Sequence, residues 1–227
     1  MPPHNHDGTG GMHLYIPWWK FDRKNEFPRG YHIELGGGRE MPSAGMFDDD
    51  CEEVEGYGTA LKSTLRKRYG ATIGFAGRGE MIPNPDTYCE IDPDTVDQFG
   101  IPVLRFHFRW SEYELLQARD MQETFRAIVE AGGGVYRTRT QADGPYPYGI
   151  QPGGKIIHEV GTARMGIDPR TSVLNGYCQA HEVRNLFVTD GAPLVTNPDK
   201  NPTLTIMALS WRASEYLLDE AKKGNLE

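Results

Sequence analysis

Residues 103–134 read VLRFHFRWSEYELLQARDMQETFRAIVEAGGG, and this stretch predicts a strand followed directly by a helix. Apolar and polar side chains alternate up to residue 110, which is typical of a sheet with one packed face and one polar face. The packed face would carry Leu104, Phe106, Phe108 and Trp110. Ser111 and Glu114 then have capping-box spacing, an apolar stripe follows at helical spacing, and glycines 132–134 end the helix.

Two further elements are predicted upstream of this stretch. Residues 31–35 (YHIEL) alternate apolar and polar side chains, with His32 and Glu34 on the polar face, so we expect a short half-buried strand. Residues 57–69 place apolar side chains at helical spacing between glycines, which predicts a short helix.

Downstream, the last 70 residues predict a strand and a long helix. Residues 186–188 (LFV) form a continuous apolar run, typical of a strand buried on both faces. In the final helix Asn201 is the expected N-cap and Pro202 the first helical residue. Apolar residues spread around this helix predict burial on most sides: Leu204, Met207, Leu209, Trp211, Leu217 and Leu218.

The composition describes a globular protein of one ordinary or two small domains. The chain has 227 residues, of which 38% are hydrophobic and 25% charged, so an intrinsically disordered chain is excluded. A net charge of −8 argues against nonspecific nucleic-acid binding. No apolar run approaches the ~20 residues of a membrane span, and the N-terminus has no signal-peptide pattern. These features favour a soluble, cytoplasmic protein and leave the compartment open.

The cysteines and most histidines do not predict a site. Three widely spaced cysteines without a CxxC pair exclude a disulfide scaffold and a cysteine-based zinc site. His4 and His6 beside Asp7 have metal-ligand spacing but no third ligand in a fixed frame, so we assign no metal site. Structural roles are expected for the histidines at positions 13, 32, 107 and 181.

His158 differs from the others because of its surroundings. Residues 156–166 read IIHEVGTARMG, which places the imidazole after an apolar pair and before closely spaced glycines. Glycines permit the backbone to approach another surface, including a flat ligand. From spacing alone, a hydrogen-bonded core histidine remains the alternative.

The start of the final helix is a second candidate site. A helix N-terminus presents free N–H groups and a partial positive charge, which suits an anion. Because Pro202 lacks a donor, Thr203 and Leu204 would supply the N–H groups. A capped terminal helix without a ligand is the alternative.

Three separated motifs together resemble the C-terminal signature of the glucose–methanol–choline (GMC) oxidoreductases, which oxidise alcohols and sugars with FAD. They are HEVGTARMG at 158–166, NLFVTDGAP at 185–193 and NPTLTIMAL at 201–209. The resemblance covers residues 156–221 in detail, whereas residues 1–155 resemble the family's substrate domain more loosely. It implies that His158 is the active-site histidine and that Asn201 falls at its partner position.

The resemblance also implies which residues contact the cofactor. Asp190 and Gly191 would form the turn against FAD, and the Pro202–Thr203 backbone would approach the pyrimidine edge of the flavin. The sequence departs from the family in one respect: it contains no GxGxxG fingerprint for the FAD pyrophosphate. We therefore expect a second polypeptide to carry that half, or this chain to be a fragment or truncated product.

These considerations predict an α/β (α+β) fold. Residues 1–155 would form the substrate domain, an antiparallel sheet with flanking helices. Residues 156–227 would contribute the catalytic pair, together with one strand and one helix of an incomplete FAD-binding domain. His158 would accept a hydroxyl proton while hydride moves to flavin N5, and Asn201 would hold the oxygen. Trp18, Trp19, Trp110, Arg105 and Arg109 are candidates for sugar contacts, with packing and surface charge as the alternative.

A non-catalytic module that binds a carbohydrate or a partner without flavin is the competing hypothesis. Under either hypothesis, the final strand and helix should expose an apolar surface where they lack neighbours.

Overall fold

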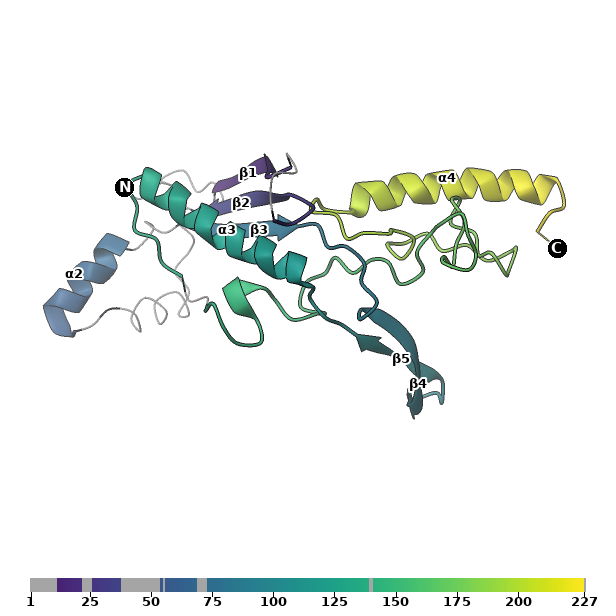
Figure 1. Cartoon of the computed structure of the whole chain (residues 1–227), viewed down its shortest axis with the longest axis horizontal. Helices are drawn as coiled ribbons and strands as arrows, with labels where there is room; N and C mark the ends of the chain where they lie inside the picture. Colours follow the sequence, from purple (N-terminus) through teal and green to yellow (C-terminus); the bar gives the residue numbers. More distant parts are fainter. Residues whose placement is uncertain are drawn as a thin grey trace. The chain divides into compact units, whose positions relative to one another are not determined.

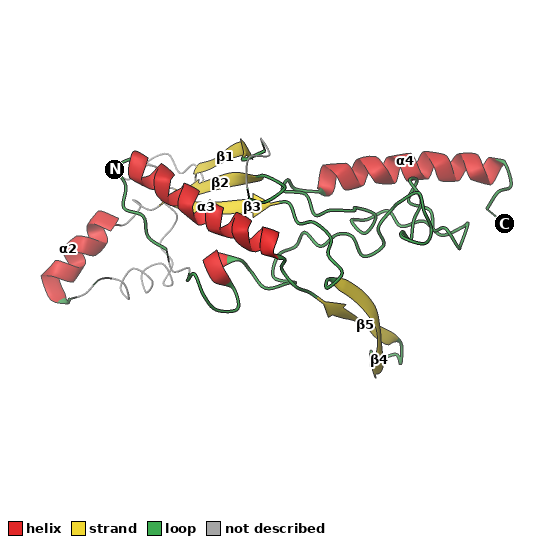
Figure 2. Ribbon diagram, viewed as in Figure 1, coloured by secondary structure: helices red, strands yellow, loops and turns green. Residues whose placement is uncertain are grey.

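The computed structural model describes residues 12–21, 26–37, 54, 56–68, 73–138 and 141–226, with the side chains at 12, 13 and 18 left out. Figure 1 labels the helices and strands, and the chain divides into two compact units. One contains residues 1–19 and 31–78, and the other contains residues 20–30 and 79–227. The histidine pair at positions 4 and 6 lies outside the described residues. Strands and helices alternate with long loops (Figure 2), which confirms the predicted mixed α/β class.

The first unit is built on a three-stranded sheet of order β1-β2-β3. Strand β1 (Met12–Trp19) pairs antiparallel with β2 (Tyr31–Gly37), and β3 is Ile73–Gly79. Leu14 faces Leu35 and Ile16 faces Ile33 across the first pair, and a bulge follows. Helix α2 (Gly58–Arg68) confirms the helix predicted over 57–69, and Leu65 is its buried residue.

Strand β2 confirms the strand predicted at 31–35 but not its polar face. Tyr31 and Ile33 are fully buried, and His32, expected on a polar face, is also buried. Its Nε2 lies 3.2 Å from Glu34 Oε1, and the same oxygen lies 3.2 Å from Arg78 Nε. Charged partners within the unit therefore permit a histidine at a buried position that alternation alone assigns to solvent.

The second unit begins with an antiparallel hairpin of β4 (Tyr88–Val96) and β5 (Pro102–His107). The predicted strand over 103–110 is confirmed in its first part and ends at His107. Its expected packed face is exposed: Leu104 is 54% and Phe106 64% exposed. The alternation of apolar and polar residues predicts which side chains share a face of the sheet, but it does not predict what covers that face. A two-stranded sheet has no second layer of its own.

The opposite face of the hairpin is polar and paired within itself. Arg105 Nε donates to Asp92 Oδ2 at 2.9 Å, and His107 Nε2 lies 2.8 Å from Glu90 Oε1. The imidazole of His107 also stacks on Tyr88 at 4.3 Å between ring centroids. These contacts confirm a structural role for His107.

Helix α3 (Glu112–Ala131) follows as predicted from the capping box and ends at Gly132. The main-chain N–H of Ser111 donates to Glu114 Oε2 at 2.8 Å, which satisfies a donor at the helix start. Met121 and Phe125 of the apolar stripe are buried. Gln117 is also buried, and its Nε2 donates to the carbonyl oxygens of Arg29 and Gly30.

The remainder of the second unit is a long run of loops, the short 3₁₀ helix η1 (Pro147–Gly149) and helix α4 (Thr203–Lys222). The strand expected at 186–188 is wrong as a continuous element. Only Phe187 forms a bridge, with Gln179, and Leu186 is 48% exposed. An apolar run needs a neighbouring strand along its whole length to form a strand, and here its main-chain bonds go to residues 178 and 180 and to a turn at Val183.

Helix α4 has the predicted length but not the predicted burial. Ala213 is its buried residue, whereas Leu204 is 78% and Trp211 73% exposed. The expectation of an exposed apolar surface on this helix is therefore confirmed, and the expectation of burial on most sides is wrong within this chain. No described helix is both long enough and apolar enough to cross a membrane.

Candidate active site

The segment after His158 runs beside the turn at residues 191–193. The main-chain N–H of Gly161 donates to the carbonyl of Gly191 at 3.3 Å, and that of Ala163 donates to Ala192 O at 3.2 Å. A third such bond joins Met165 N to Pro193 O at 2.9 Å. Two of the three signature motifs are therefore joined along their main chains.

The Asp190–Gly191 turn is tightly packed at its second position. Gly191 is buried, and an added Cβ would lie 3.1 Å from Val160 Cγ1 and 3.2 Å from Glu159 O. Ile206 Cδ1 of α4 would lie 3.5 Å away, so the third motif also approaches this point. Asp190 is exposed, and its Oδ1 accepts a hydrogen bond from Ala192 N at 2.7 Å, which holds the turn.

The start of α4 differs from the prediction by one residue. Pro202 is the N-cap, with φ −81° and ψ −13°, and no side chain caps the helix. Asn201 is exposed and lies before the cap, so its predicted N-cap role is wrong. Pro202 already has helical dihedral angles and its carbonyl accepts the first helical hydrogen bond, from Ile206 N, so the helical conformation begins there rather than at Asn201.

The uncapped helix start leaves main-chain donors free of a side-chain partner. The Ile206 N–H is bonded to Pro202 O at 3.0 Å, so the N–H groups of Thr203, Leu204 and Thr205 precede the first intrahelical bond. No acidic residue occupies the first turn. This end of α4 therefore presents a partial positive charge and three donors, which is an arrangement suited to an anionic or carbonyl-bearing group.

His158 is half-buried and is held through its main chain. Its carbonyl oxygen accepts a hydrogen bond from Asn197 Nδ2 at 2.9 Å. The described residues show no hydrogen bond between His158 and Asn201, so their pairing stays a prediction. The spacing of the motifs gave no reason to single out Asn197, because its role depends on the path of the loop that precedes α4.

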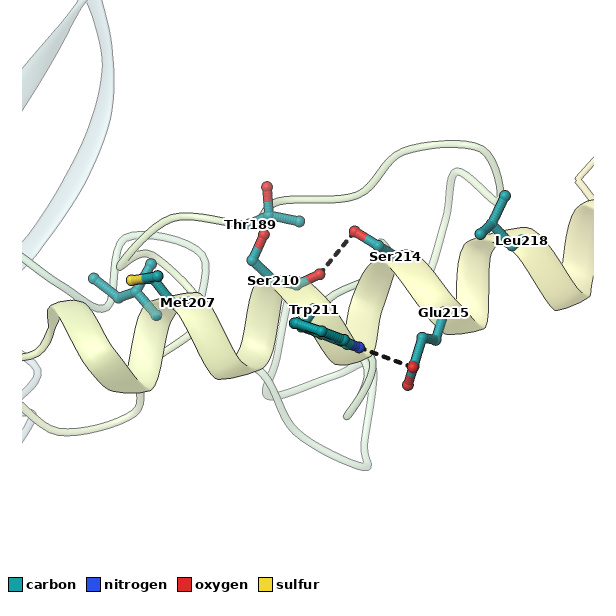
Figure 3. A pocket seen from close by; sticks show the side chains of 8 residues that line it. Thr189, Met207, Ser210, Trp211, Ser214, Glu215 and Leu218 are labelled. Carbon is teal, nitrogen blue, oxygen red and sulfur yellow. Dashed lines mark hydrogen bonds between the residues drawn. The ribbon is translucent and has the colours of Figure 1, made fainter.

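A shallow groove of about 560 Å³ lies along α4 beside this site (Figure 3). Thr189, which precedes the Asp190 turn, lines it together with side chains of α4. The Trp211 indole N–H donates to Glu215 Oε1 at 2.8 Å and fixes the ring in the groove. Sequence reasoning missed this groove because it treated the same residues as core.

The residues present fit one edge of a flavin. A tightly packed glycine turn and three uncapped donors at a helix start would allow a flat, hydrogen-bond-accepting ring to approach the main chain. Groups of three or more His, Cys, Asp or Glu side chains arranged to hold a metal are absent from the part of the chain that is described.

Three of the five candidate sugar contacts, Trp110, Arg105 and Arg109, are engaged in structural interactions. The Trp110 indole N–H donates to Gln151 O at 2.8 Å, and Arg109 Nη1 lies 3.4 Å from Asp86 Oδ2. The pairing of Arg105 with Asp92 is described above. The Trp18 side chain lies outside the described residues, and the role of these residues in sugar binding stays a prediction.

Comparison with known proteins assigns the family. The family model described as GMC oxidoreductase matches residues 83–210. The chain is 30% identical to the fructose dehydrogenase large subunit of Gluconobacter japonicus, over 74% of this chain and 29% of that protein. It is 32% identical to the 2-methyl-1,2-propanediol dehydrogenase of Mycolicibacterium austroafricanum, over 72% of this chain and 28% of that protein.

A third relative is the gluconate 2-dehydrogenase flavoprotein of Pantoea cypripedii, 27% identical over 74% of this chain and 27% of that protein. The chain therefore spans less than a third of the length of these relatives. The family model covers more than half of the chain, and it includes the three joined segments of the candidate site. This chain belongs to the GMC oxidoreductase family.

Proposed function

We propose that this chain is the substrate-binding and catalytic part of an FAD-dependent oxidoreductase that acts on CH–OH groups of sugars or other alcohols. The observation that carries the proposal is the junction of the His158 segment, the Gly191 turn and the start of α4 within the matched region. Relatives named as dehydrogenases of fructose, gluconate and a diol support this substrate class.

The proposal divides the chain by role. Residues 1–155 bind substrate, and residues 156–227 provide the catalytic pair and the flavin-facing turn. A second polypeptide, or a further part of a longer one, supplies the GxGxxG half that holds the FAD pyrophosphate. One relative is named a large subunit, which supports an assembly of several chains.

The residues of this chain have distinct chemical tasks in the proposal. FAD, when bound, supplies the acceptor for the substrate hydride. The His158 imidazole accepts the hydroxyl proton as the general base. The exposed Asn201 amide holds the same hydroxyl oxygen, and the donors at the start of α4 stabilise negative charge at the cofactor edge.

The test is flavin reduction in the assembly that contains this chain. Anaerobic mixing with fructose, gluconate or 2-methyl-1,2-propanediol should bleach the flavin absorbance with at least one of them. His158→Ala should slow that bleaching by about two to four orders of magnitude, which is the usual contribution of a general base.

The matched control is His181→Ala. His181 is also half-buried, and its Nε2 lies 3.0 Å from Ser172 Oγ within the loop region. This variant should reduce flavin at the parent rate. A folded His158→Ala assembly that bleaches at the parent rate would contradict the assignment, and an assembly without flavin would favour the non-catalytic module.

A further inference from the structure

We propose that Asn197 is a positioning residue for His158, holding the histidine main chain against the loop that leads into α4. The inference rests on the proposed function of His158. It concerns a residue outside the three signature motifs, and it follows from contacts that lie on three separate segments of the second unit.

The side chain of Asn197 makes the first contact. Its Nδ2 donates to the carbonyl oxygen of His158 at 2.9 Å, across 39 residues of sequence. Within the described residues, this is the hydrogen bond that fixes the carbonyl of His158. An imidazole is oriented by the backbone that carries it, so a bond at this carbonyl restrains where the ring can point.

The main chain of Asn197 makes the second contact. Its N–H donates to Met81 O at 3.1 Å, and its carbonyl accepts from Met81 N at 3.0 Å. The two bonds form an isolated antiparallel bridge. The main chain of Asn197 is thus held by the Met81 segment while its side chain bonds to the His158 segment, which is what a positioning residue requires.

The Met81 segment is itself anchored to a helix. The adjacent Ile82 N–H donates to Glu114 Oε1 at 3.3 Å, and Glu114 is a buried carboxylate in the first turn of α3. The contacts therefore run from α3 through residues 81–82 and Asn197 to His158. Asn197 lies four residues before Asn201, so the same loop connects both members of the predicted catalytic pair.

The chemistry of the bond selects an amide at position 197. Only a donor can satisfy the carbonyl of His158, and aspartate has the same shape as asparagine but presents two acceptor oxygens when ionised. Asn197→Asp therefore removes the donor without changing the volume of the side chain. Asn197→Gln retains an amide donor and provides the conservative rescue.

The first experiment measures the exposure of the His158 ring in the full chain, without cofactor. Diethyl pyrocarbonate labels accessible imidazoles. Trypsin cleaves after Lys155 and after Arg164, and the resulting peptide 156–164 contains His158 as its single histidine. His181 is released alone in the peptide 171–184 and serves as an internal reference. We expect Asn197→Asp to increase labelling of the first peptide several-fold and to leave the second unchanged.

The second experiment measures kinetics in the flavin-containing assembly. A misplacement of about 1 Å can cost about 100-fold in rate, so Asn197→Asp should lower kcat by about 10-fold to 100-fold. The substrate KM should stay within about three-fold, because the contact lies behind the histidine and not on the substrate. Asn197→Gln should recover part of the kcat.

The control variant is Asn84→Ala. Asn84 Nδ2 likewise donates to a main-chain carbonyl, that of Arg109, at 3.2 Å, but it lies before the β4–β5 hairpin. This variant should leave the labelling of peptide 156–164 unchanged.

The outcomes separate this inference from the function on which it rests. If His158→Ala abolishes flavin reduction but Asn197→Asp keeps the parent kcat, the positioning role is overturned and the function stands. Equal increases in labelling of both peptides would show a global loss of structure and would also overturn it. If His158→Ala itself reduces flavin normally, the proposed function fails, whatever Asn197 does.

Discussion

Asn201 is exposed and precedes the cap of α4, and Pro202 takes the N-cap position. The side chain is therefore free to contact a substrate, and it contributes no cap bond to the stability of the helix. We expect Asn201→Ala to slow flavin reduction and to change the free energy of unfolding by less than about 0.5 kcal/mol, as for an ordinary surface substitution.

Urea unfolding of the parent and variant chains measures that stability directly. A side chain that capped α4 would cost about 1 kcal/mol on truncation. A loss of that size in Asn201→Ala would mean that the helix start in solution differs from the one described. An unchanged rate of flavin reduction would remove Asn201 from the proposed catalytic pair.

Glu34 in strand β2 predicts a pH dependence of stability. Burial acts to raise the pKa of Glu34, but hydrogen bonds from His32 and Arg78 outweigh it and hold this pKa below its ordinary value. A carboxyl whose pKa is lowered by folding stabilises the native state fully above the unfolded pKa of about 4.3, and this contribution is lost as pH falls through the folded value.

Acid unfolding of the sheet in the first unit should therefore begin below about pH 4. In Glu34→Gln, the urea midpoint should be lower at neutral pH, and its decrease between pH 5 and pH 3 should be shallower than in the parent. If both proteins lose stability in parallel over that range, Glu34 does not supply the acid sensitivity.

At the scale of elements, α4 exposes apolar side chains that ordinary surface helices bury. Met207 is 63% exposed and lies with Leu204, Trp211 and Leu218 on one side of the helix, by its 3.6-residue period. Removing such a side chain from water contributes about 1.5–3 kcal/mol. We therefore expect this face to contact the FAD-binding half of the proposed function, whether a second polypeptide or a further part of a longer one carries it.

Where a separate polypeptide carries that half, Met207→Glu and Trp211→Glu should reduce its co-purification by at least about ten-fold, because each places a charge in an apolar contact. The chain itself should stay folded, since both residues are exposed within it. Ala142→Glu, an equivalent acidic substitution at an exposed loop position, is the control. Normal recovery of the partner with both α4 variants would exclude this face from the interface.

At the scale of the whole molecule, the proposed function assigns one edge of a flavin site to this chain. Its contribution is the Gly191 turn and the donors before Ile206, and the sequence has no GxGxxG loop to hold a pyrophosphate. We expect the purified chain alone to bind FAD weakly or not at all. Equilibrium dialysis and the visible spectrum test this, and a stoichiometrically yellow 227-residue chain would contradict it.

The sequence alone determined the elements whose ends depend on residues close together along the chain. The capping pair Ser111 and Glu114 predicted the start of α3, and the glycines at 132–134 predicted its end, because caps and breakers act within one helical turn. The three motifs also predicted the family, which the match over residues 83–210 confirms.

Only the tertiary structure decided which apolar faces are covered and which residue holds His158. Alternation along β5 and the apolar residues of α4 predicted burial, but burial depends on a second surface that the pattern does not specify. Alternation puts His32 on the polar face of its strand, yet it is buried, with Glu34 Oε1 3.2 Å from its Nε2. Asn197 reaches His158 across 39 residues, and no local spacing could predict a contact that depends on how distant loops meet.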